Sequence, residues 1–409
     1  MFSKQEKIII FTLAAIQFNH IVDFMIIMPL GPQLMRIFEI GPEKFSLLVS
    51  AYTFMAGISG FLASFYADRF DRKKNLIFMF IGFAIATGLC GTADNYVTLL
   101  IFRSLAGFFG GVMGSLVLSI VSDVIDYRRR GMAMGTMMAS FSVASIAGVP
   151  LSLFLAHQFG WHAPFYFLMC TSFFVLIFVF KFIPQLNEHL KNKTSKDYLE
   201  PIKQILKNKT QLNALLFMFI LMLSHFAIIP FISPSLVANA GITEAQLPLI
   251  YLVGGLCSIF TAPLIGRLSD KKGKAVVYRI SLVLSAIPVF LMTHQNVAPV
   301  YLVLTIAGLF FISAGARMIP ASTLVSSAAD PQQRGSFMSI LSCVQSMAMA
   351  FGAWFAGQII QKNPANGRLE NYHIVGYIAI GISLLSLILL QKIQHLDNTE
   401  DFTKKEKVT

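Results

Sequence analysis

The fold is decided by a charged stretch that occurs twice: residues 68–74 read DRFDRKK and residues 270–274 read DKKGK. The two stretches begin 202 positions apart, and each follows a long apolar run. A second pair repeats with an offset of 204, as DYRRRG at 126–131 and DPQQRG at 330–335. Two near-equal offsets within one chain predict that a single unit has been duplicated.

The composition around these stretches is that of a membrane protein. Hydrophobic residues make up 56% of the 409 residues, and charged residues make up only 13%, about half the share in a soluble domain. The mean hydropathy is +0.68. A soluble chain of this size cannot bury so much apolar surface, so the composition excludes a soluble enzyme or a nucleic-acid-binding protein.

The apolar runs are long enough to cross a bilayer, which takes about 20 residues of helix. We predict an all-α integral membrane protein with twelve transmembrane helices, in two pseudo-symmetric six-helix bundles around a central cavity. The predicted spans are 8–34, 45–66, 75–92, 97–122, 131–156, 164–183, 211–237, 248–268, 276–294, 299–325, 335–360 and 374–392.

Basic residues predict the orientation of these spans. Lysines and arginines fall mainly on alternate connecting segments, which lie in the cytoplasm if the N-terminus does. This pattern predicts a multi-pass protein with both termini cytoplasmic. It also explains the net charge of +12 without a nucleic-acid partner. The basic residues expected outside are Arg36, Lys44, Lys362 and Arg368.

The longest cytoplasmic segment separates six spans from six. We expect an N-terminal bundle at 1–183, a linker at 184–210, a C-terminal bundle at 211–392 and a cytoplasmic tail at 393–409. Both copies begin inside, so the bundles are expected to be parallel repeats about an axis along the membrane normal. The linker is also expected to form a short surface helix, with an apolar face made by Leu199, Ile202, Ile205 and Leu206.

The repeated stretch resembles the signature that major facilitator superfamily transporters carry after the second span, roughly G-x-L-a-D-r-x-G-r-k. The resemblance covers essentially the whole chain. The first copy departs from the signature, with Ser64 and Asp71 in place of the two glycines, although Asp68 and Arg72 remain. The second copy matches at Gly266, Leu268, Asp270, Gly273 and Lys274.

Two inner spans carry further likenesses to this superfamily. Gly148 and Pro150 are similar to the G-x-P signature of proton-coupled antiporters, particularly the arabinose-efflux-like and purine-efflux-like branch, although Ser152 replaces a common glycine. Arg103 and the glycines after it resemble the fourth-span R-x-x-x-G signature. The resemblance implies proton-driven efflux of small, partly apolar molecules by rocking of two halves, with no enzymatic activity and no bound cofactor.

Other function classes stay open. The runner-up is proton-coupled uptake or efflux of a sugar, nucleoside or other metabolite. A membrane-embedded enzyme would need a catalytic motif, and no HExxH, GxSxG or P-loop pattern occurs in the sequence. Four scattered cysteines predict neither a disulfide framework nor a metal site. The expected partners are the substrate, protons and lipid, and the chain is expected to be a monomer in a bacterial inner membrane.

Three formal charges fall well inside the predicted spans, more than a turn from either end: Asp23, Arg103 and Arg317. An ionisable residue within the bilayer is costly and by default marks a transport pathway or a coupling site. Asn19 and His20 lie on the same helical face as Asp23. We predict that Asp23 carries the coupling proton. The alternative is a structural carboxylate paired with His20 or with a neighbouring helix.

The repeat assigns a partner position in the second half. An offset of 202 aligns Asp23 with His225, and Pro32 with Pro234. His225 is therefore a candidate second titrating group, with a hydrogen-bonded packing residue as the alternative. Proline-broken helices at matched positions point to the central cavity; the matched prolines are Pro29 and Pro32 in the first half, and Pro230 and Pro234 in the second.

The two intramembrane arginines have separate expectations. Arg103 is expected to balance the charge of Asp23, with binding of an anionic substrate group as the alternative. Arg317 either takes part in transport or extends to the inner membrane surface. The glycines after Arg103 are expected to form a small-residue packing face, namely Gly107, Gly110, Gly111 and Gly114. The Gly148–Pro150 segment is expected to form a kink and a flat surface against a helix of the other half.

The charged loops are expected to control gating. Asp68 would cap the eleventh span near Gly335 while paired with Arg72 or Arg128, which would stabilise the outward-facing state. Asp270 would act in the same way in the second copy. The alternative is that these charges enforce topology alone. The remaining members of the expected gating set are Arg130, Lys274 and Arg334.

Overall fold

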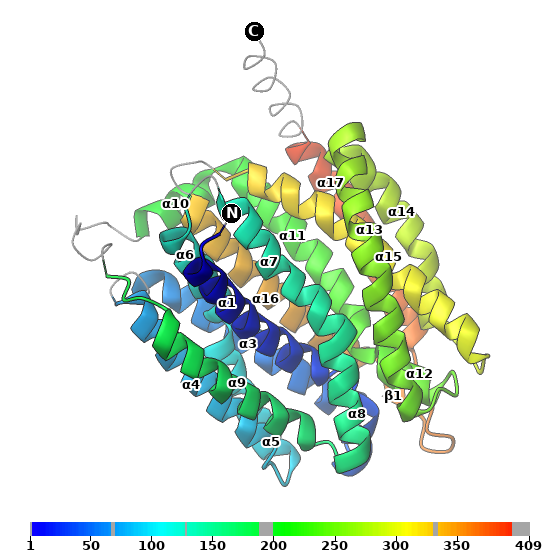
Figure 1. The fold of residues 1–409 in the computed structure, drawn as a ribbon. Coiled ribbons are helices and arrows are strands. Elements are labelled where there is room, and N and C mark those ends of the chain that lie inside the picture. The colour runs from blue at the N-terminus through cyan, green and yellow to red at the C-terminus, as the bar shows by residue number, and fades with distance from the viewer. Residues whose placement is uncertain (1, 67–69, 127–128, 188–198, 330–333, 395–409) are drawn as a thin grey trace. The chain divides into compact units, whose positions relative to one another are not determined.

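A computed structural model describes residues 2–66, 70–126, 129–187, 199–329 and 334–394. Within these ranges, twelve helical segments are long and apolar enough to cross a membrane. Figure 1 shows the helices of the chain. The prediction of an all-α protein with twelve spans is confirmed. The contacts divide the chain into two compact units, Met1–Lys196 with Thr243–Leu252 and Asp197–Ile242 with Val253–Thr409.

The first unit consists mainly of the helices of the first six spans, and it also includes Thr243–Leu252. Several spans are interrupted and therefore carry more than one label. The helices are α1 (Lys4–Ile26), α2 (Gly31–Ile37), α3 (Pro42–Tyr66), α4 (Arg72–Cys90), α5 (Tyr96–Gly110), α6 (Met113–Val124), α7 (Arg130–Val143), η3 (Ala144–Gly148), α8 (Val149–Phe159) and α9 (Ala163–Phe182).

The second half of the chain repeats this arrangement behind a short leading helix, and it adds one small hairpin. The elements are α10 (Leu199–Lys207), α11 (Lys209–Ile228), η5 (Ile229–Phe231), α12 (Ile232–Ala238), η6 (Glu244–Gln246), α13 (Leu247–Lys272), α14 (Lys274–Thr293), α15 (Val300–Ser327), α16 (Arg334–Ile359), β1 (Gln361–Lys362), β2 (Leu369–Glu370) and α17 (Tyr372–Ile393). The two strands pair antiparallel.

Proline and glycine account for two of the interruptions. The first span breaks between Ile26 and Gly31, next to Pro29, and the seventh breaks at Ile229–Phe231, around Pro230. Proline removes a helical hydrogen bond and its ring clashes with the preceding turn. The breaks therefore fall at the matched prolines of the two repeats. Such breaks in a membrane helix are tolerated where neighbouring groups satisfy the freed backbone.

Each unit has its own apolar core. The larger core of the first unit includes Leu13, Phe80 and Ile120, which are fully buried. The core of the second unit includes Phe217 and Phe337. Many other large apolar side chains are exposed along the helices, as expected where lipid replaces water outside the bundle.

The linker contains a short helix, α10, and its predicted place on the membrane surface stays a prediction. Ile205 is fully buried and belongs to the core of the second unit, whereas Leu206 is 54% exposed. The predicted apolar face is therefore only partly buried. Asn208 ends this helix and caps the next one, because its side chain accepts hydrogen bonds from the backbone of Thr210 and Gln211. The expected domain boundaries at 183, 210 and 392 stay a prediction.

Candidate functional site

The first unit buries an ion pair between α1 and α5. Oδ2 of Asp23 lies 3.1 Å from Nη1 of Arg103, and both side chains are 0% exposed. The same Nη1 donates to the main-chain oxygen of Asp23 at 3.2 Å. The second carboxylate oxygen, Oδ1, accepts from the hydroxyl of Thr87 on α4 at 3.2 Å. Three helices therefore hold this carboxylate.

An aromatic ring completes the surroundings of the guanidinium. The guanidinium carbon of Arg103 lies 4.3 Å from the centre of the ring of Tyr52 on α3, which is within the range of a cation–π contact. Tyr52 is itself buried, with 2% exposure. The positive charge is thus stabilised by one carboxylate and one ring face.

Small residues bring α3 and α5 close enough to build this site. A β-carbon added at Gly107 would lie 2.2 Å from the main-chain oxygen of Tyr52, and one added at Gly111 would lie 2.2 Å from that of Ala56. One at Gly110 would lie 2.8 Å from the Tyr52 hydroxyl. The predicted glycine face is therefore observed at these three positions. The face does not extend to Gly114, where no described atom lies within 4 Å of an added β-carbon.

We expect Gly107→Ala to destabilise the first unit by about 1–3 kcal/mol or more, because the added methyl meets main-chain atoms that cannot rotate away. Gly114→Ala is the matched control, since it adds the same methyl where nothing lies within 4 Å. The control should be neutral or slightly stabilising, because alanine favours helix. Thermal unfolding of the detergent-purified variants measures the difference. Equal melting temperatures for the two variants would contradict close packing at Gly107.

The three residues predicted to share one face of α1 contact different neighbours. The amide of Asn19 donates to the main-chain oxygen of Ala15 and accepts from the hydroxyl of Thr171 on α9 at 2.6 Å. His20 lies among aromatic rings, 5.9 Å from Phe83 between ring centres. Neither ring nitrogen of His20 has a hydrogen-bond partner among the described residues. Neither residue is a partner of Asp23, so the pairing of Asp23 with His20 is excluded as its structural role.

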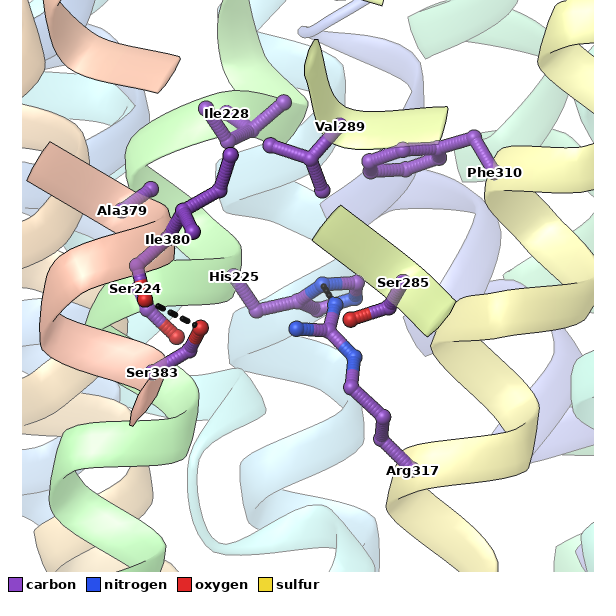
Figure 2. Close-up of a pocket in the computed structure, with 10 residues that line it drawn as sticks. All are labelled: Ser224, His225, Ile228, Ser285, Val289, Phe310, Arg317, Ala379, Ile380 and Ser383. Carbon is purple, nitrogen blue, oxygen red and sulfur yellow. Dashed lines mark hydrogen bonds between the residues drawn. The ribbon is translucent and has the colours of Figure 1, made fainter. Parts of the chain in front are cut away.

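The second unit buries a different pair at the repeat-related position. Nη2 of Arg317 on α15 lies 3.4 Å from Nδ1 of His225 on α11. The His225 ring also stacks on Phe310, with centres 6.0 Å apart and an 8° angle between the planes. Figure 2 shows both polar side chains meeting inside a small cavity of this bundle. Arg317 is 4% exposed, so it does not extend to the inner surface.

The fifth span departs from its expected packing. A β-carbon at Gly148 would lie 2.3 Å from the Val22 side chain of α1, so its flat surface faces a helix of the same half. The prediction of a surface against the other half is therefore wrong for Gly148. A five-residue π segment, η3, ends at Gly148, and Pro150 stands in the first turn of α8. The widened turn distorts the span, because π segments add a residue to the helical repeat.

This close packing recurs in the second half. Gly352, which is 204 positions after Gly148, would place a β-carbon 2.4 Å from the main-chain oxygen of Leu223 on α11. A glycine of the fifth span therefore lets the first span pack closely against it, and a glycine of the eleventh span does the same for the seventh span. The two helices that carry Asp23 and His225 are held in the same way.

The loops expected to lie in the cytoplasm show part of the expected gating set. Asp68 and Arg128 lie outside the described residues. Nη1 of Arg72 lies 3.1 Å from a carboxylate oxygen of Asp123 on α6. Asp71 caps α4, because it accepts from the backbone of Lys74 at 3.0 Å and from that of Leu186 at 3.1 Å. A carboxylate in place of the signature glycine therefore ties two loops together.

The other expected gating residues have ordinary positions at helix ends. Nε of Arg130 donates to the main-chain oxygen of Ile125 at 3.0 Å. Asp270 and Arg334 are exposed, near the end of α13 and at the start of α16, whereas Lys274 is buried at the start of α14. Their role in gating stays a prediction.

Sequence reasoning missed several residues that contribute to these contacts. Thr87 and Tyr52 complete the Asp23 site, and Asp123 pairs with Arg72. Glu6 forms a two-bond ion pair with Arg129 at 2.8 and 2.9 Å, which fastens the start of α1 to the segment before α7. The acidic residues were visible in the sequence at the ends of spans that carry the basic loops. Neutral threonines and tyrosines within spans carried no comparable signal.

The fold and buried charges are those of a two-bundle membrane transporter. The profile of the Major Facilitator Superfamily matches residues 13–224 and 214–407. The chain belongs to this superfamily, which confirms the resemblance seen in the loops. It is a multi-pass transporter of small solutes, not an enzyme.

Relatives and a solved structure agree with this assignment. The chain is 25% identical over 375 residues to YceJ, an uncharacterized MFS-type transporter of Bacillus subtilis (strain 168), covering 91% of this chain and 92% of that one. It is 22% identical to a probable sugar efflux transporter of Helicobacter pylori (strain P12), covering 66% and 68%. The crystal structure of a bacterial homolog of the human lysosomal transporter Spinster superposes with a TM-score of 0.78 at 15% identity, covering 98% of this chain and 99% of that chain.

Proposed function

We propose that this protein is a proton-coupled antiporter that exports small, partly apolar molecules across a bacterial inner membrane, with both termini in the cytoplasm. Its two halves would alternate access by rocking about a central substrate site. The observation that carries the proposal is the fully buried ion pair between Asp23 and Arg103. A buried pair is a weak source of stability, since desolvation offsets most of its attraction. Its presence in a membrane helix is better explained by function.

Each protonation state of the Asp23 carboxylate would have stabilising contacts in this geometry. Ionised Asp23 has a full counter-charge 3.1 Å away and a hydroxyl donor, Thr87. Protonated Asp23 no longer needs to be desolvated as an ion, but it leaves Arg103 with the ring of Tyr52 and a main-chain oxygen as its stabilising partners. Proton binding would therefore remove the cost of burying an ionised carboxylate, and it would also remove the counter-charge of Arg103. A site that loads and unloads a proton requires such opposing effects.

The position of the pair connects protonation to helix movement. Asp23 lies one turn before α1 ends at Ile26, where the span is broken by the segment next to Pro29. Arg103 also holds the main-chain oxygen of Asp23. Neutralising the carboxylate weakens a contact that fixes the end of α1. The break provides the local freedom by which that helix can respond.

The loops and the fifth span belong to the same proposal. Charges after the second and eighth spans, including Asp68 and Asp270, would favour one orientation of the halves over the other. Similarity to a probable sugar efflux transporter supports export and keeps a sugar or another metabolite as the second candidate substrate. Coupled uptake is the second candidate direction.

A transport screen in inside-out membrane vesicles tests the proposal. The probes are the dye Hoechst 33342 and labelled sugars and nucleosides. We expect at least one probe to accumulate in the lumen of vesicles that contain the protein when the lumen is acid, and to leak out when a protonophore removes the gradient. Vesicles without the protein are the control. Accumulation that is indifferent to the gradient would contradict proton coupling, and accumulation only with an alkaline lumen would indicate symport.

A further inference from the structure

The cavity shown in Figure 2 lies inside the second unit. It is lined by side chains of α11, α14, α15 and α17, so it is enclosed within one bundle. Its free volume is about 10 Å³, so it holds at most one ligand of the size of a water molecule or a monatomic ion. A drug-sized or sugar-sized substrate does not fit in this space.

Arg317 brings a buried positive charge to this cavity. Among the described residues that line it, none is acidic. The sequence itself limits the possible partners, because residues 209–393 hold four acidic residues and all of them lie at or beyond the ends of spans, namely Glu244, Asp270, Asp330 and Glu370. An isolated buried guanidinium is costly unless an anion or an acceptor reaches it.

The guanidinium is incompletely satisfied in the bundle. Nε of Arg317 is buried with no hydrogen-bond partner among the described residues, and Nη2 makes a long 3.4 Å contact with Nδ1 of His225. A neutral His225 that accepts at Nδ1 carries its proton on Nε2. The imidazole is then a second donor on the wall of the same cavity.

Serine hydroxyls add donors that can be redirected. Ser224, Ser285 and Ser383 line the cavity, and each now donates to a main-chain oxygen of its own helix at 2.6–2.9 Å. A hydroxyl can rotate about its C–O bond to donate to another acceptor. The walls therefore combine one fixed cation with several neutral donors. That set of groups favours a small anion over a cation or a neutral polar ligand.

We propose that this cavity binds one monovalent anion of single-atom size, of the halide class, with chloride as the ligand. The anion supplies the counter-charge that Arg317 lacks within its bundle. The inference does not depend on proton coupling at Asp23, because the two sites lie in different units. His225 would then help to bind an anion. At the matched position of the first unit, the negative charge is supplied by the protein itself, as the carboxylate of Asp23.

Direct binding of radioactive chloride tests the proposal. The full-length protein is purified in detergent, in gluconate buffer of constant ionic strength, and dialysed to equilibrium against ³⁶Cl⁻. We expect saturable binding of one chloride per chain, displaced by bromide but not by the larger sulfate. Arg317→Gln should weaken the affinity by at least about tenfold, because it removes the charge. Size-exclusion chromatography checks that each variant is folded.

Two further variants make the result decisive. Ser383→Leu keeps the arginine but fills the cavity, and it should also abolish chloride binding. If Arg317→Gln does not fold, this variant tests whether chloride binds in the cavity. Arg279→Gln removes an exposed arginine that is hydrogen-bonded to Gln394, and this variant should bind chloride as the wild type does. No saturable binding to the wild type would overturn the proposal, and so would binding that survives both cavity variants.

Discussion

Asp23→Asn is expected to abolish accumulation driven by a pH gradient while leaving downhill exchange of the same substrate measurable. Asparagine keeps the shape of the side chain and an oxygen that can accept from Arg103, but it cannot titrate. It therefore resembles the protonated state that a coupled transporter must visit in each cycle. Accumulation and counterflow of a probe identified in vesicles, measured in proteoliposomes, separate the two activities.

The matched control is Asn19→Asp on the same helix. Asn19 lies one turn away and contacts Thr171 on α9, not the ion pair. The double variant Asn19→Asp/Asp23→Asn keeps one carboxylate on this helix but moves it away from Arg103. Transport driven by the gradient should stay absent in it. Full accumulation by Asp23→Asn alone would show that this carboxylate is structural.

Arg103→Gln replaces the arginine with an uncharged residue and is expected to lower the free energy of unfolding of the first unit by about 3–5 kcal/mol. The reason is that the Asp23 carboxylate stays buried without its counter-charge. Asp23 and Arg103 are both 0% exposed, so solvent cannot replace the lost partner. Thermal unfolding in detergent, compared with the exposed-site control Arg279→Gln, measures the loss.

The double variant Asp23→Asn/Arg103→Gln distinguishes a coupling pair from a structural one. Removing both charges removes the desolvation cost of both, so stability should return toward that of the wild type while gradient-driven transport stays absent. We also expect Asp23→Asn alone to be better tolerated than Arg103→Gln, since only the former resembles a state of the cycle. Equal destabilisation by the two single variants would favour a purely structural pair.

The spans were predictable from the sequence because apolar runs and basic loops are read directly from residue types. The internal breaks of the spans were less predictable from the sequence. The first span was expected over 8–34 with a break at its prolines, and the structure ends α1 at Ile26 and starts α2 at Gly31. Pro29 indicated a break, but the exact end depends on packing with neighbouring helices. The π segment at 144–148 has no comparable sequence signal.

The charged members of the site were predictable, since an ionisable residue within a span is rare and stands out. Their pairing depended on three-dimensional position. Arg103 was expected near Asp23, whereas the partner of His225 was not foreseen. Arg317 is offset by 214 positions from Arg103, which does not match the repeat of 202–204. The two bundles therefore supply their arginines from different turns of the fourth and tenth spans.

The packing role of glycine was predictable as a class but not position by position. A spacing of three and four residues placed Gly107, Gly110, Gly111 and Gly114 on one face. Only the first three meet a neighbouring helix. The helix is interrupted after Gly110, so the last glycine no longer continues that face. Gly148 was assigned to the wrong neighbour, because spacing identifies a close contact without identifying the helix that makes it.

Proton movement itself tests the central claim most directly. Proteoliposomes that hold the pH dye pyranine are given substrate on the outside, with no initial pH difference and the membrane potential clamped. Antiport predicts that substrate entry drives protons out and makes the lumen alkaline with the wild type, while Asp23→Asn admits the substrate with no change in pH. Substrate entry through the wild-type protein without any pH change, or an equal pH change with Asp23→Asn, would contradict proton coupling at Asp23.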